Sequence, residues 1–173
     1  MPVRPNILSN ATARQDFVTA VLALNREMSG VRSQSLSITG PDTELSTWDL
    51  FALWHYYTMN TPTPQGTDRN AAHRGPVFVP WHRWFLLLME AQMQRVLNKP
   101  TFGLPYWDWS ADGDQPAGQQ TSLGIWDALG HGGFPVSDGP FAFSQVNAQS
   151  FRVRVVEDPA AGQLRMVNRG LWR

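Results

Sequence analysis

Apolar side chains recur at helical spacing near the start of the chain. Thr12, with Gln15 three residues later, has the pattern of a capping box and predicts where a helix begins. Gly30 is the expected end of this helix, and the Ser-, Thr-, Gly- and Pro-containing segment 31–45 is predicted to be a loop. One side of the helix carries apolar residues at intervals of four, three and four: Phe17, Val21, Leu24 and Met28.

Two further helices are predicted in the middle of the chain. Ser46, with Asp49 three residues later, opens a helix that fades near Asn60, where the segment Thr-Pro-Thr-Pro-Gln-Gly interrupts it. The next helix has Pro80 as its first residue and runs through Trp81 to about Leu97. Proline suits the first position of a helix because the N–H that it lacks has no helical partner there.

The last third of the chain predicts loops and one hairpin. Segment 104–144 is rich in Gly, Pro and Gln, which is typical of irregular structure. Segment 151–155 alternates apolar and charged residues like a half-buried strand, and 163–168 can return as the second arm after a turn at 158–162. The predicted fold class is therefore mainly α, with long ordered loops and a small β-hairpin near the C-terminal end.

Composition narrows the possible classes of protein. The 173 residues suffice for about one domain, and 16% are charged, against roughly 25% in an average soluble domain, which favours a covered face. The net charge is zero and no basic stripe occurs, so nucleic acid is not expected as a partner. The longest apolar run, 85–89, is far shorter than the ~20 residues of a membrane span. No signal peptide is recognisable, so a cytoplasmic location, or secretion without its own signal, is expected.

Three of the four histidines lie close together in the sequence. His55 falls on one predicted helix, His82 on the next, and His73 on the loop between them. Two facing helices and a loop can direct three imidazoles at one point, which is how metal sites in helical bundles are built. Neutral imidazoles do not attract Mg²⁺ or Ca²⁺, so copper or zinc is the expected ion. The alternative for each histidine is an ordinary polar or core residue.

Three segments resemble the tyrosinase family, the type 3 copper phenol oxidases related to catechol oxidases and hemocyanins. Segment 73–87, His-Arg-Gly-Pro-Val-Phe-Val-Pro-Trp-His-Arg-Trp-Phe-Leu-Leu, is similar to the first copper-binding segment of the family. Segment 104–109, Leu-Pro-Tyr-Trp-Asp-Trp, resembles the next signature, and Asp-Gly-Pro-Phe at 138–141 also matches. The resemblance runs from about Phe17 to the end of the chain, is closest to compact bacterial members, and implies a helical bundle of the type 3 copper kind.

The resemblance also implies roles for individual residues. His55, His73 and His82 correspond to the three ligands of one copper, called CuA. Glu90 corresponds to a family acid that supports the site from outside the ligand set, with a solvated helix carboxylate as the alternative, whereas Asp108 is expected to be structural. His131 matches no copper ligand and is expected on a surface loop. Five aromatic residues are expected to pack in the core: Trp81, Trp84, Phe85, Trp107 and Trp109.

The family uses two coppers, each held by three histidines, and this chain lacks the second set. After His82 only His131 remains. Residues 1–173 are therefore expected to be the N-terminal, CuA-containing portion of a single tyrosinase-like domain. The remaining C-terminal (CuB) half of the same precursor is the expected partner, and a cut after Arg173 would separate the two.

The implied function is copper-dependent oxidation of phenols with O2. The reaction would be o-hydroxylation of monophenols, oxidation of o-diphenols to o-quinones, or both, with the small-molecule phenol and O2 as partners. A small caddie protein that delivers copper is a further expected partner. Three alternatives stay open: an o-aminophenol oxidase, a hemocyanin-like oxygen carrier, and a mononuclear zinc hydrolase with three histidine ligands.

Overall fold

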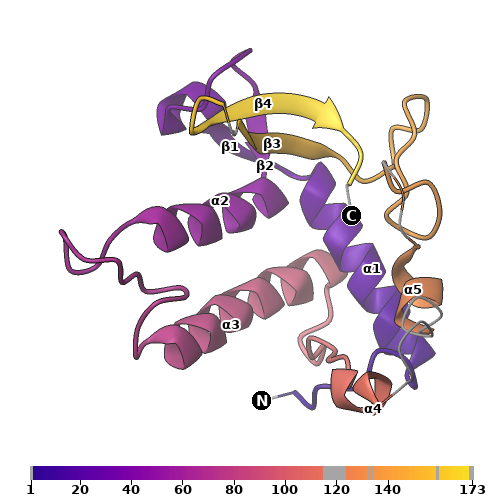
Figure 1. The fold of residues 1–173 in the computed structure, drawn as a ribbon. Coiled ribbons are helices and arrows are strands. Elements are labelled where there is room, and N and C mark those ends of the chain that lie inside the picture. Colours follow the sequence, from indigo (N-terminus) through magenta and orange to yellow (C-terminus); the bar gives the residue numbers. More distant parts are fainter. Residues whose placement is uncertain (1, 115–123, 132, 134, 159, 172–173) are drawn as a thin grey trace.

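Helices make up most of the ordered structure, and two small antiparallel sheets lie beside them (Figure 1). This confirms the predicted fold class of a mainly α protein with a hairpin near its C-terminal end. The computed structural model describes residues 2–114, 124–131, 133, 135–158 and 160–171. In chain order the elements are α1 (Ala11–Arg26), β1 (Met28–Arg32), the 3-10 helix η1 (Ser33–Leu36), β2 (Glu44–Ser46), α2 (Thr47–Asn60), α3 (Phe78–Leu97), α4 (Trp109–Gly113), α5 (Gly124–Leu129), β3 (Val153–Asp158) and β4 (Gln163–Arg169).

Helix α1 begins and ends earlier than the sequence predicted. Its N-cap is Asn10, whose side-chain oxygen accepts the Ala13 N–H at 2.8 Å, so the predicted start at Thr12 is wrong. Asn is among the strongest N-cap residues, and here it prevails over the weaker Thr signal that follows it. The helix ends at Arg26, and Gly30 lies in β1 with φ +80° rather than ending the helix.

The predicted loop over 31–45 is wrong in part, because this segment contains the end of β1, the 3-10 helix η1 and the start of β2. Strand β1 pairs with β2 in antiparallel fashion, and Met28, predicted to be helical, pairs with Ser46. The turn between the strands is closed by Asp42, whose side chain accepts the Arg32 Nε–H at 2.5 Å. The chain thus reverses direction between β1 and β2, and β2 leads directly into α2.

Helices α2 and α3 match the prediction closely. Ser46 caps α2, and Ser46 and Asp49 form the reciprocal capping box that their spacing predicted. Helix α3 begins at Phe78, so Pro80 is its third residue and the helix starts two residues before the predicted position. Its end agrees with the prediction, where Asn98 takes a left-handed conformation with φ +49°.

The predicted hairpin is confirmed as β3 and β4, which are antiparallel and joined by a turn near Gly162. The first strand begins at Val153, two residues later than predicted, and Phe151 is instead buried in the core. Thr39 links the hairpin to the chain between β1 and β2, because its backbone N–H donates to the Leu164 carbonyl and its carbonyl accepts the Met166 N–H.

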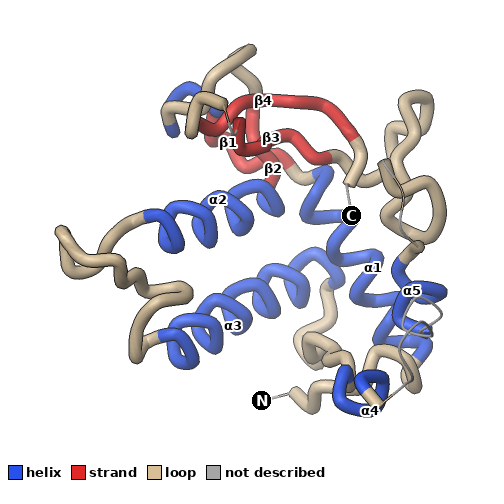
Figure 2. Tube along the Cα trace, viewed as in Figure 1, coloured by secondary structure: helices blue, strands red, loops and turns tan. Residues whose placement is uncertain are grey.

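Helix α1 crosses one end of the α2–α3 pair, so the other end projects away from it (Figures 1 and 2). The main core gathers where α1 meets α3, and a second cluster of Ile38, Leu45, Leu53 and Leu164 lies between α2 and the sheets. Between α2 and α3 the contact is aromatic: Phe51 and Trp54 meet Phe85 at ring distances of 5.6 and 5.2 Å. The projecting end of this pair carries the histidines.

The predicted burial of five aromatic residues is only partly correct. Phe85 is buried, but Trp84 on α3 is 58% exposed and Trp109 at the start of α4 is 71% exposed. The helices α4 and α5 themselves lie within the segment predicted to be irregular. Residues 115–123 of that segment and the last two residues of the chain fall outside the described residues. No helix in the described part combines the length and apolar character needed to cross a bilayer.

Candidate metal centre

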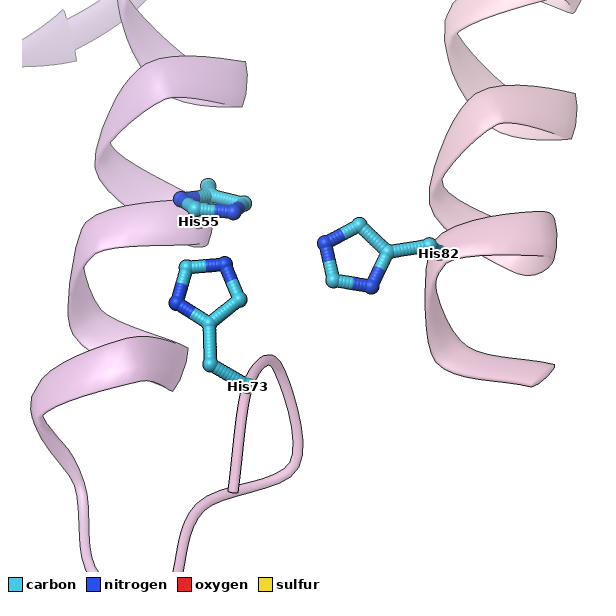
Figure 3. A group of neighbouring side chains, drawn as sticks. All are labelled: His55, His73 and His82. Carbon is cyan, nitrogen blue, oxygen red and sulfur yellow. The ribbon is translucent and has the colours of Figure 1, made fainter. Parts of the chain in front are cut away.

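The three predicted histidines meet at the projecting end of the α2–α3 pair. His55 comes from α2, His82 from the first turns of α3, and His73 from the loop that joins the two helices (Figure 3). One ring nitrogen from each residue lies within 4.8 Å of the other two. The ring centroids are 4.8 Å apart for His55 and His73, 5.7 Å for His55 and His82, and 5.5 Å for His73 and His82.

The two helical histidines are held by their surroundings. Nδ1 of His82 lies 2.9 Å from the Phe78 carbonyl oxygen, which can only accept, so Nδ1 carries the proton and Nε2 is left free for a metal. His55 is half-buried beside Trp81 and Phe85, whose rings lie 5.7 and 6.0 Å from its own. These contacts limit the directions in which both imidazoles can point.

His73 is the exposed member of the set and is held through its backbone. Its N–H donates to Oδ1 of Asn70 at 2.7 Å, and the Arg74 N–H lies 3.3 Å from the Asn70 carbonyl oxygen. Asn70 is only 6% exposed. Our sequence analysis missed Asn70, although an Asn three residues before a bonded N–H is a common capping pattern that marks such a turn.

The electrostatic setting keeps His55 neutral at pH 7. Burial, and then the charges that His73 and His82 acquire when protonated, hold the pKa of His55 below its ordinary value of 6.5. A neutral imidazole is the form that binds a metal, so this shift prepares His55 for coordination.

Copper or zinc fits this donor set. Bonds from zinc to imidazole nitrogen are about 2.0–2.1 Å long. Nitrogens within 4.8 Å of one another are thus nearly close enough to share one ion, and small side-chain rotations would complete the approach. With three imidazoles and no carboxylate, the group suits copper or zinc rather than Mg²⁺ or Ca²⁺.

Glu90 has neither of the roles considered for it. The side chain is buried, and its Oε2 accepts the Leu104 N–H at 2.7 Å and lies 3.3 Å from Nε of Arg4. It therefore fastens the segment after α3 and the N-terminal segment onto the helix, and no bond joins it to the histidines. A buried carboxylate with two donors is a structural anchor.

Asp108 and His131 lie outside the histidine group. Asp108 accepts a hydrogen bond from the Ser110 hydroxyl at 2.6 Å, in line with the structural role expected for it. His131 lies between two carboxylates, 3.1 Å from Asp127 and 2.9 Å from Asp138, on the exposed segment after α5. Its hydrogen bonds hold the pKa of Asp138 below the ordinary value.

Comparison with known proteins agrees with this centre. The family model described as the common central domain of tyrosinase matches residues 45–170, which include all three histidines. A 5,6-dihydroxyindole-2-carboxylic acid oxidase of Ambystoma mexicanum is 33% identical over 132 residues, or 66% of this chain and 24% of that protein. A tyrosinase of Pelodiscus sinensis is 34% identical over 106 residues, or 59% of this chain and 36% of that protein.

A further relative matches a shorter stretch of the chain at higher identity. A tyrosinase of Felis catus is 40% identical over 70 residues, which cover 38% of this chain and 13% of that protein. This chain therefore spans only about a third or less of each relative's length. All three relatives are vertebrate proteins, so closeness to bacterial members stays a prediction. Because the family model covers well over half of the chain, the chain belongs to the tyrosinase family.

Proposed function

We propose that this chain holds one copper ion of a tyrosinase-type oxidase that oxidises phenols with O2. The observation that carries the proposal is the convergence of His55, His73 and His82 in the segment where the family model matches. The three imidazoles suit copper and zinc alike. Copper is favoured because the chain belongs to the tyrosinase family, whose members are copper enzymes. Each of these three residues is proposed as a ligand of that ion.

The residues of this chain would place and shield the metal. Bound copper would supply the redox chemistry with O2, which amino-acid side chains cannot perform. His82, fixed through its Nδ1 by the Phe78 carbonyl, would offer Nε2 in a constant direction. The aromatic rings of Trp81 and Phe85 limit the access of water to His55 from the side of α3.

The complete enzyme is proposed to contain a second copper held by a CuB half of the same precursor. This chain spans about a quarter of the Ambystoma mexicanum relative. Exposed apolar side chains at the start of α3, on Val77, Phe78 and Val79, lie near the histidines and suit coverage by further protein. A copper-delivering caddie, and a location in the cytoplasm or outside the cell after export with such a helper, remain proposals.

An o-diphenol or a monophenol is the proposed substrate. The dihydroxyindole in the name of the Ambystoma mexicanum relative is an o-diphenol, which supports this class. Copper-loaded chain, alone and joined to the CuB half, would be assayed with tyrosine, catechol and o-aminophenol. We expect catechol turnover from the joined protein and none from the chain alone.

Three results would contradict this proposal. Turnover of o-aminophenol without catechol would assign the enzyme to the aminophenol oxidases, and reversible O2 binding without turnover would indicate an oxygen carrier. Zinc without copper in freshly purified protein would favour a hydrolase. Metal analysis of that protein comes first because it separates the zinc hydrolase from both kinds of copper protein.

A further inference from the structure

His73 is the only one of the three histidines that no helix holds. It lies on the 61–77 connection, its side chain is exposed, and among the described residues its ring contacts are with His55, His82 and Phe78. Because no hydrogen bond of the described residues fixes this imidazole, the position of its backbone decides where the ring lies.

Asn70 is the side chain that sets this backbone. Its Oδ1 accepts the His73 N–H at 2.7 Å, and its carbonyl oxygen lies 3.3 Å from the Arg74 N–H. The two bonds close a single turn that carries His73. Asn70 is buried, as is Ala72 within the same turn, whereas the residues of 61–69 are exposed. The turn is thus seated on the protein while the rest of the loop before it lies in solvent.

We propose that Asn70 is a positioning residue that aims His73 at the metal centre. The inference rests on the proposed function and adds to it a residue that binds no metal. Asn70 is buried, so losing its bond to the His73 N–H would leave a buried acceptor without a partner, which is costly. Without it, the turn would sample other conformations and the three nitrogens would converge less often, which weakens metal binding.

Three substitutions in the 173-residue chain test the proposal. N70A removes the acceptor. N70S keeps a neutral oxygen acceptor of the kind that caps turns, and therefore adds no charge near the metal. T67V is the matched control in the same loop, because Thr67 donates to the Pro64 carbonyl at 2.8 Å and accepts the Arg69 N–H at 3.3 Å without bonding to His73.

The first measurement is copper affinity by competition with a chelator, together with the Cu(II) electron paramagnetic resonance spectrum. We expect N70A to bind copper ~10- to 100-fold more weakly and with a changed spectrum, as for other residues that orient a ligand. N70S should recover most of this loss, and T67V should match the unsubstituted chain. Equal affinity and identical spectra for N70A and the unsubstituted chain would overturn the proposal.

The second measurement needs no metal. Hydrogen exchange of the His73 amide in the metal-free chain, followed by nuclear magnetic resonance, should be at least ~10-fold faster in N70A, and unchanged in T67V. Unchanged exchange in N70A would show that Asn70 does not hold His73. If the unsubstituted chain bound no copper, the proposed function would fail, whereas faster exchange in N70A would still support the part played by Asn70.

Discussion

At the scale of single residues, each histidine of the centre is held by a different kind of contact. His55 is fixed by aromatic packing, His82 by the Phe78 carbonyl, and His73 by the side chain of Asn70. The contacts of His55 and His82 are made by residues of α2 and α3, so they form when these two helices form and pack. The third contact depends on a turn in a loop, and we therefore expect His73 to be the most sensitive of the three proposed ligands to local change.

The lowered pKa of His55 predicts how the metal-free chain responds to acid. In the folded chain His55 binds its proton less readily than in the unfolded chain, where the value is about 6.5. The contribution of His55 to stability is therefore complete above the unfolded pKa of about 6.5. It is lost as the pH falls from there through the lower pKa of the folded chain. Urea unfolding at pH 7.5, 6 and 5 should show a smaller loss of stability in His55→Gln than in the unsubstituted chain. Equal losses of stability in both proteins would contradict a lowered pKa of His55 in the folded chain.

The sequence was enough to predict that the three histidines converge, but not how they are held. Consecutive helices usually pack beside each other, which allows residues near the joined ends to come close, and the resemblance of segment 73–87 to the family's copper-binding segment singled out the three histidines. The environment of Glu90 was not predictable in this way. Its partners, Leu104 and Arg4, approach α3 from segments without periodic patterns, and only the packed structure brings them there.

At the scale of elements, capping residues predicted the start of a helix well where only one candidate cap was present. Ser46 and Asp49 correctly marked the start of α2. At α1 the prediction named Thr12, but Asn10 two residues earlier is the stronger N-cap residue and begins the helix. The sequence of β1, Met-Ser-Gly-Val-Arg, does not alternate apolar and polar side chains, and β2 has only three residues. They exist because each supplies the other's hydrogen bonds, which no local pattern records.

The start of α2 also predicts a measurable loss of stability. Ser46→Ala removes the buried hydroxyl that accepts the Asp49 N–H at 3.1 Å and donates to its carboxylate at 2.6 Å. We expect the free energy of unfolding to fall by about 1–2 kcal/mol, the usual cost of losing an N-cap. Urea unfolding would measure the change, with the exposed Ser35→Ala, whose hydroxyl bonds to the Arg32 carbonyl, as control. A loss for Ser46→Ala no larger than that of Ser35→Ala would contradict the capping role.

At the scale of the whole molecule, the metal centre lies at an end of the α2–α3 pair that α1 leaves free (Figure 1). The opposite end is tied into the main core, so it gives the pair a fixed base. The centre is therefore rigid where it joins the fold and open where the second copper of the proposed enzyme would approach. The composition, with 16% charged residues, is in keeping with a face that further protein covers.

The most direct test of the central claim is a copper titration of the 173-residue chain, with X-ray absorption to identify the ligands. We predict one copper per chain, bound by three imidazole nitrogens. Substituting Ala for His55, His73 or His82 should each weaken binding by more than ~100-fold, beyond the effect of a residue that only orients a ligand. Copper bound with unchanged affinity in these variants, or no copper bound by the unsubstituted chain, would contradict the account.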